Sequence, residues 1–220
     1  MMTNLFSAFD PSTSTNWSVN WTSLLFIMLY PPTMWVIPSR YTITFMILQK
    51  MLYNEFSMLM KNSKGMKIMF MALFNIIMIN NIMGLIPYTF TMTSHMMFSM
   101  SMSLPLWITL MMFGWIKKTN HMFSHMIPAS TPTPLMPIMV CIESISNIIR
   151  PWSLAMRLSA NMIAGHLIMS LLGNSSMNKS TSLSILMWLM MLLMMFEMMV
   201  AIIQAYVFSI LSILYSSEVN

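Results

Sequence analysis

The sequence predicts an all-α membrane protein with about five transmembrane helices and one interfacial helix, the last two spans being long and strongly tilted. Of the 220 residues 57% are hydrophobic and only 7% are charged, and no soluble domain of this size is solvated in that way. No Asp, Glu, Lys or Arg occurs between Lys67 and Lys117, and two spans fit there because one needs roughly 20 apolar residues. The apolar runs are too irregular for barrel strands, so helices must satisfy the backbone hydrogen bonds.

Each predicted segment is an apolar run bounded by charged or turn-forming residues, and all of them belong to one membrane domain, 1–220. In chain order they are a first span at 17–37, an interfacial helix at 42–62, a second span at 66–91, a third at 96–116, a fourth at 135–172 and a fifth at 182–215. Pro31 and Pro32 are expected to kink the end of the first span.

The interfacial helix differs from the spans in its polar residues. Lys50, Asn54 and Lys61 fall on one helical stripe, and Met, Leu and Phe cover the rest of the surface. Such a helix is predicted to lie in the membrane interface rather than to cross the bilayer.

The fourth and fifth spans are too long to stand upright in a bilayer. At ~1.5 Å per residue each is on the order of 50 Å long, against a hydrocarbon core of ~30 Å. Strong tilt, a kink at Pro151, or both must absorb the excess length. Tilt of this size needs a packing partner, so we expect a large lateral surface that faces another protein.

The basic residues predict the orientation of the chain. Five of them lie between 40 and 67, and two more, at 117–118, precede the fourth span. With five crossings both groups share one side of the membrane, and the loop at Lys179 lies on the other. The positive-inside rule then puts the N-terminus outside and Asn220 on the basic, matrix-like side.

Ionisable groups inside spans cost roughly 2.5–3.5 kcal/mol each on insertion scales and are therefore functional candidates by default. The candidates and their polar neighbours are Glu143, Arg150, Arg157, Asn161 and His166 in the fourth span and Glu197 and Gln204 in the fifth. Glu143, Arg150 and Arg157 are seven residues apart and share a helical stripe, as do Glu197 and Gln204. His166 faces roughly the other way.

The two arginines have different interpretations. For Arg150 we favour a structural ion pair with Glu143 within the membrane. Arg157 follows a proline kink and precedes a run without charge, Leu158 to Leu172, so it cannot easily reach either headgroup region. It needs a carboxylate partner, and another chain can supply one.

A resemblance to a known family begins at Pro134. Residues 134–168 read PLMPIMVCIESISNIIRPWSLAMRLSANMIAGHLI and resemble the signature of subunit a of the rotary proton-translocating ATP synthase, in its mitochondrially encoded form. Residues 196–215, FEMMVAIIQAYVFSILSILY, are similar to the last helix of that family. These runs cover about a quarter of the chain, and the N-terminal half matches only in hydropathy and segment order. Ser130 departs from the glycine common in relatives.

The resemblance implies a stator subunit that couples proton flow to rotation through two half-channels in the mitochondrial inner membrane. Arg157 would be the essential arginine that faces the rotor ring of c subunits, engages their carboxylates and separates the half-channels. Glu197 and His166 would belong to the channel from the intermembrane space, Glu143 to the matrix-side exit, and Asn161 and Gln204 would lie close to the arginine. Peripheral stator subunits and the lipid bilayer are the other expected partners.

Residue chemistry agrees with that role. A guanidinium keeps its proton, so it can hold a carboxylate ionised without relaying the proton itself. Carboxylates and imidazoles can exchange protons near neutral pH in suitable surroundings. ATP chemistry is not expected in this chain, which would be a non-catalytic channel subunit.

Two other functions stay open on the sequence. A secondary proton carrier usually shows internal repeats with broken helices, and no repeat is found. A structural subunit of another respiratory complex would tolerate Lys or Gln in place of Arg157. No cofactor, metal or nucleic acid is expected: the 35 Met residues are dispersed, Cys141 is the only cysteine, and His121 and His125 have no third ligand nearby.

Overall fold

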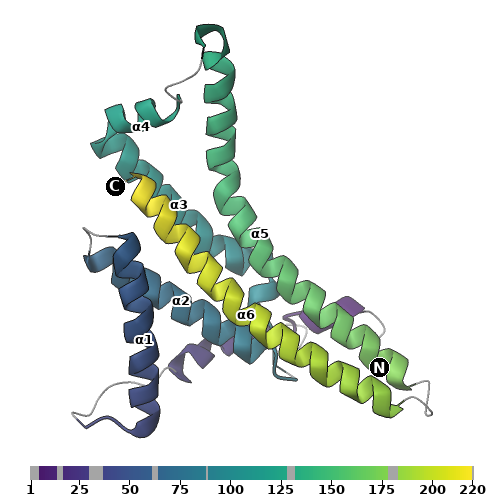
Figure 1. Cartoon of the computed structure of the whole chain (residues 1–220). Helices are drawn as coiled ribbons and strands as arrows, with labels where there is room; N and C mark the ends of the chain where they lie inside the picture. Colours follow the sequence, from purple (N-terminus) through teal and green to yellow (C-terminus); the bar gives the residue numbers. More distant parts are fainter. Residues whose placement is uncertain are drawn as a thin grey trace.

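The computed structural model describes residues 5–13, 17–29, 37–60, 64–87, 89–127, 132–177 and 183–219. Every regular element within these ranges is helical (Figure 1). The α-helices are α1 (Arg40–Leu59), α2 (Lys64–Gly84), α3 (Met96–Lys117), α4 (Thr119–His125), α5 (Met136–Met177) and α6 (Leu183–Val219), and the 3-10 helices are η1 (Leu5–Phe9), η2 (Val19–Leu29), η3 (Met92–Ser94) and η4 (Thr133–Leu135). Among the described residues, α2, α3, α5 and α6 are long and apolar enough to cross a membrane, which confirms the predicted fold class.

The helix ends differ from the predicted ones at several places. The second span was predicted to run to Thr91, but α2 ends at Gly84. The hydroxyl of Thr89 lies within hydrogen-bond distance of two carbonyl oxygens, those of Met83 at 2.6 Å and Ile86 at 2.7 Å, and so stabilises the turn that ends the helix. Pro87 disfavours further helix as well.

The predicted interfacial helix coincides with α1, and its place in the membrane stays a prediction. The described part of the predicted first span contains η2, and the crossing at 17–37 also stays a prediction. Several residues used in the sequence argument lie outside the described residues, namely Pro31, Pro32, Lys61, Lys179 and the loop residues Pro128 to Ser130.

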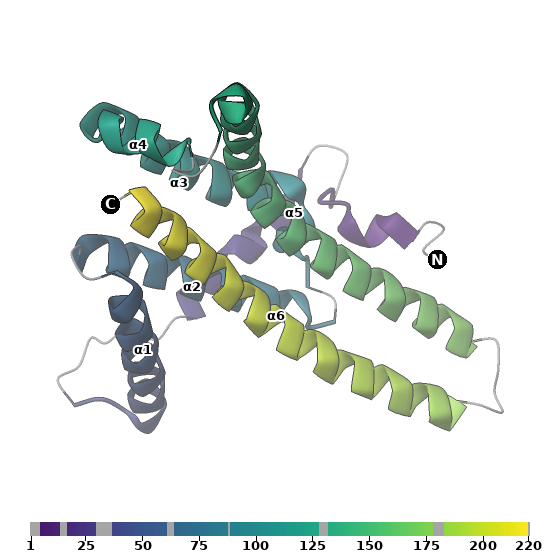
Figure 2. The same cartoon turned by 45° about the horizontal axis from the view of Figure 1, so that its top comes forward.

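The two longest helices dominate the structure. α5 has 42 residues and α6 has 37, which corresponds to on the order of 60 and 55 Å at 1.5 Å per residue. Figures 1 and 2 show the second half of α5 and the first half of α6 side by side and antiparallel. α5 changes direction along its length (Figure 1), and it contains Pro151, which removes one backbone hydrogen bond.

One hydrophobic cluster holds the central helices together. It joins Phe74 and Ile77 of α2 to Leu154 and Leu158 of α5 and to Phe208 of α6. Leu154 and Leu158 are one helical turn apart and both are buried. They therefore fix the turn of α5 that carries the residues between them.

Small side chains line the buried face of α6. They are Ala201, Ala205, Ser209, Ser212 and Ser216, each exposed by 1% or less. Small residues at three- and four-residue spacing let membrane helices approach closely, and α6 packs chiefly on α2. The side-chain amide of Asn81 in α2 donates to the carbonyl oxygen of Ala201 at 3.4 Å.

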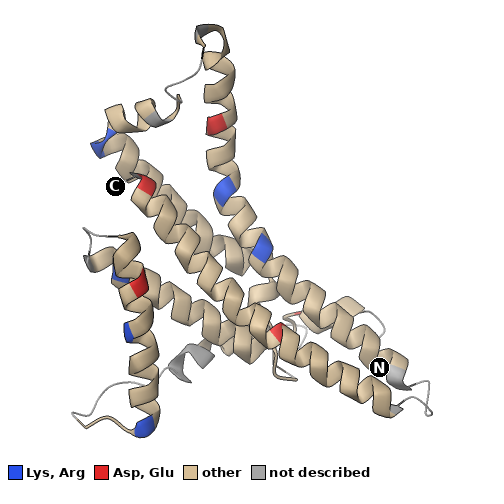
Figure 3. Ribbon diagram, viewed as in Figure 1, with Lys and Arg blue, Asp and Glu red and all other residues tan. Residues whose placement is uncertain are grey.

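The outer faces of α5 and α6 are apolar and uncovered. Trp152 of α5 is 53% exposed, and on α6 Phe196 and Met199 are 64% and 65% exposed. Figure 3 shows that charged residues are sparse along these helices. A continuous apolar surface of this kind needs lipid or another protein against it.

Candidate functional site

Arg157 lies on the outer side of α5. Its neighbours Leu154 and Leu158 point into the core, whereas its own side chain is exposed. No carboxylate among the described residues forms an ion pair with it. The structure thus presents a positive charge on an apolar helix face.

Arg150 is surrounded by the acidic groups of this region. Its Nη2 is 3.7 Å from Oε1 of Glu143, its Nη1 forms an ion pair with Glu218 of α6, and its guanidinium lies 5.2 Å from the ring centroid of Tyr215. The latter distance permits a cation–π interaction. These groups, together with Asn147, line a cavity of about 250 Å³. The predicted neighbour Glu143 is therefore engaged by Arg150, together with a second carboxylate.

Sequence reasoning missed Glu218. The last span was predicted to end at Tyr215, but α6 continues to Val219. A signal was present, because no helix breaker separates Glu218 from Tyr215. Its proximity to Arg150, 68 residues away, depends on the packing of two helices.

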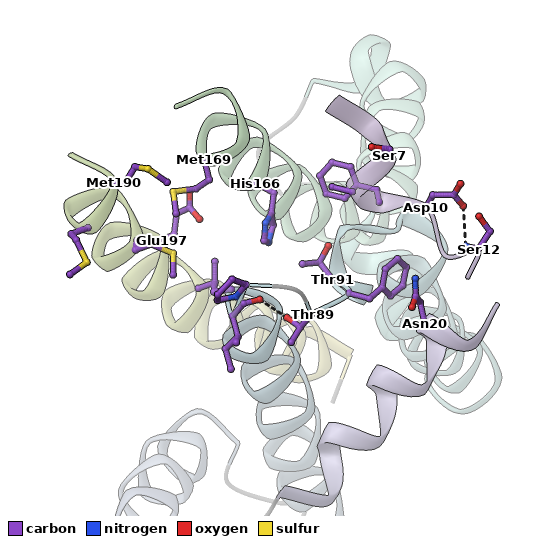
Figure 4. A pocket seen from close by; sticks show the side chains of 18 of the residues that line it. Ser7, Asp10, Ser12, Asn20, Thr89, Thr91, His166, Met169, Met190 and Glu197 are labelled. Atoms are coloured by element: carbon purple, nitrogen blue, oxygen red, sulfur yellow. Dashed lines mark hydrogen bonds between the residues drawn. The ribbon is translucent and has the colours of Figure 1, made fainter. Parts of the chain in front are cut away.

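His166 and Glu197 line one cavity of about 790 Å³ (Figure 4). The buried Nε2 of His166 has no hydrogen-bond partner among the described residues. The wall of this cavity is mostly apolar but includes Asp10, Thr89, His166 and Glu197, and a cavity with several polar groups that is larger than the ~30 Å³ of one water molecule can be hydrated. The arrangement can therefore exchange protons between an imidazole, water and a carboxylate.

Gly165 makes room for Glu197. A Cβ atom at this position would lie 2.8 Å from both Cδ and Oε1 of Glu197, which is shorter than an ordinary van der Waals contact. The carboxylate of α6 thus lies directly against the backbone of α5. Sequence reasoning did not identify Gly165 because its role depends on the partner helix.

Glu197 also lines a second cavity, of about 440 Å³, together with Asn161, Met162 and Phe196. One carboxylate thus borders two cavities, one that contains His166 and one that contains Asn161. Gln204 is half-buried two turns further along α6 and is not among the residues that line either cavity.

The N-terminal segment covers the cavity of His166. The ring of Phe9 meets the ring of His166 edge-on, with 6.2 Å between centroids. Asp10 lines the same cavity, and its Oδ1 accepts a hydrogen bond from the backbone N–H of Ser12 at 3.0 Å. Hydrogen bonding from Ser12 lowers the pKa of Asp10. The sequence analysis did not name Asp10 as a candidate site residue. The feature that could have drawn attention to it is that Asp10 is the only aspartate in the chain.

Comparison with known proteins gives consistent matches over the whole chain. The family model described as ATP synthase A chain matches residues 14–217. The chain is 51% identical over 224 residues to ATP synthase subunit a of Drosophila melanogaster, 51% over 227 residues to that of Aedes aegypti and 53% over 224 residues to that of Locusta migratoria. Each alignment covers 100% of both chains, so the similarity includes the N-terminal half.

Proposed function

The chain belongs to the ATP synthase A chain family, the proton-translocating stator subunits of the membrane sector, and we propose that Arg157 separates two proton half-channels and engages carboxylates of a rotor ring. Family membership sets aside the two alternatives, a structural subunit of another complex and a secondary carrier. The further partners in this proposal are the c subunits of the ring and the peripheral stator subunits.

The observation that carries the proposal is the contrast between the two arginines. Arg150 is engaged by Glu143 and Glu218, whereas Arg157 is exposed and has no ion-pair partner among the described residues. A guanidinium on an apolar face gains most from a carboxylate brought by another chain, because such a pair is little screened by water. Each rotor carboxylate that arrives would be held ionised there.

Two groups of proton-exchanging side chains support offset half-channels. Along α5, Glu143 lies 14 residues before Arg157 and His166 lies nine residues after it, which corresponds to roughly 21 Å and 14 Å along the helix axis. The cavity of Glu143 would open to the matrix side, and the cavity of His166 and Glu197 to the other side. A proton can then pass between them only by way of the rotor.

The antiparallel packing of α5 and α6 supports a place for Gln204 near the arginine. Glu197 lies against Gly165, so a residue seven positions later on α6 comes level with a residue about seven positions earlier on α5. Gln204 is therefore expected level with Arg157 and Leu158. Asn161, one turn after Arg157, would provide a second amide on the same helix.

The proposed location is the mitochondrial inner membrane, with the N-terminus toward the intermembrane space. In Figures 1 and 2 the C-terminus lies near the start of α2 and the end of α3. Lys117 ends α3 and Lys118 follows it, so this end of the bundle agrees with a matrix side under the positive-inside rule.

The test compares proton flux and ATP synthesis in sealed vesicles that contain the assembled complex. Arg157→Gln removes the charge, and Arg157→Lys keeps a charge without the planar, two-pronged donor geometry. We expect both variants to assemble and to lose ~100-fold or more in both rates, the typical effect of removing a preorganised charge. Arg40→Gln, an exposed charge loss at the start of α1, is the matched control and should retain both rates. Near-parent rates in either Arg157 variant would make Arg157 a packing residue.

A further inference from the structure

The cavity of His166 has a third titratable group at its edge. Among its described lining residues, the only side chains that titrate are Asp10, His166 and Glu197. They come from three separate segments: the turn after η1, α5 and α6. Figure 4 shows Glu197 and Asp10 on opposite sides of the cavity, with His166 between them.

The position of Asp10 is defined by contacts on both sides of it in the chain. Phe9 packs its ring against His166, with 6.2 Å between centroids. The backbone N–H of Asp10 donates to the carbonyl oxygen of Ser7 at 3.3 Å, and the N–H of Ser12 donates to the carboxylate at 3.0 Å. The carboxylate is therefore held at the cavity edge rather than projecting freely.

The surroundings of Asp10 and Glu197 differ. Asp10 is exposed, and hydrogen bonding from Ser12 lowers its pKa, so it is ionised at neutral pH. Glu197 is half-buried between α5 and α6. The cavity thus has a solvent-facing anion at one side and a sheltered carboxylate at the other.

We propose that Asp10 is the proton-collecting residue at the outer mouth of this cavity and delivers protons toward His166 and Glu197. This inference rests on the proposed function of the two interior residues. An exposed anion at the mouth of a low-dielectric cleft raises the local concentration of cations. A proton from the outer solution binds the Asp10 carboxylate, passes to water in the cavity, and leaves Asp10 ionised again for the next cycle.

The experiment uses the assembled complex in sealed vesicles and varies the buffer on the side where the N-terminus lies. With Asp10→Asn we expect ATP synthesis to fall about tenfold at mildly alkaline outer pH and low buffer concentration, the lower end of the range for electrostatic focusing. A high concentration of a mobile buffer such as imidazole should restore the rate, because the buffer then delivers protons directly. Asp10→Glu should behave like the parent at every buffer concentration.

Two comparisons make the outcome decisive. Glu55→Gln removes another exposed carboxylate, on α1 and outside the cavity, and should leave the buffer dependence unchanged. Glu197→Gln should abolish flux at every buffer concentration, and parent-like flux in that variant would overturn the proposed function itself. For Asp10→Asn, a parent-like rate at low buffer, or a loss that buffer does not restore, would overturn the role of Asp10 while leaving the interior residues in place.

Discussion

Replacing Gly165 by alanine should separate the stability of the protein from its proton flux. The added methyl group would meet Cδ and Oε1 of Glu197 at 2.8 Å, so the carboxylate must move by roughly 0.6 Å or more to reach an ordinary contact distance. The atoms that must move are the end of a flexible side chain, so the helices themselves can stay in place. Alanine also favours a helix interior over glycine by roughly 0.5–1 kcal/mol.

We therefore expect Gly165→Ala to assemble normally and to unfold at the same or a higher temperature. Displacement of a proton-exchanging group by up to 1 Å can cost about 100-fold in rate, so proton flux should fall by about 10- to 100-fold. The assay pairs thermal unfolding of the purified complex with proton flux in sealed vesicles.

Gly173→Ala is the matched control on the same helix. A Cβ atom at Gly173 meets nothing within 4 Å, so this variant should keep the parent flux. Parent-like flux in Gly165→Ala would show that proton transfer does not depend on the position of the Glu197 carboxylate. Equal losses in both variants would assign the effect to the α5 backbone instead.

Three further variants test the packing around the site. Ala205→Leu places a large side chain in the closely packed face of α6, where Ala205 is 0% exposed. It should cost about 1–3 kcal/mol of stability in thermal unfolding, and an unchanged unfolding temperature would contradict close packing there. Tyr206→Phe removes the hydrogen bond that the Tyr206 hydroxyl donates to Glu55 at 2.9 Å. Because that pair is exposed, the loss of stability in thermal unfolding should be below ~1 kcal/mol. A larger loss of stability would mean that this contact anchors α1. Glu218→Gln leaves Glu143 beside Arg150. The loss of stability should be under ~1 kcal/mol because Arg150 and Glu218 are both partly exposed. A loss of several kcal/mol would mean that the Arg150–Glu218 pair is sheltered within the complex.

The sequence was a good guide wherever the information was local. Glu143, Arg150 and Arg157 share a stripe because of helix periodicity alone, and the structure brings the first two together. The apolar runs predicted α2, α3, α5 and α6 as long helices, although the end of α2 was placed seven residues too late. That error arose because Leu85 to Thr91 carries no charge, and the turn that includes Pro87 and Thr89 ends the helix.

Three features of the site depended on tertiary structure. Glu218 reaches Arg150, Gly165 accommodates Glu197, and Asp10 borders the cavity of His166. Each joins residues from different segments, and the rotation and register of one helix against another are set by side-chain packing over its whole length.

The sequence by itself determined the membrane class, the long helices and the arginine without a partner on its own helix, because solvation and helix periodicity act along the chain. Only the tertiary structure decided which carboxylates meet which cations and which face of α5 stays exposed, because those outcomes depend on how the helices pack together.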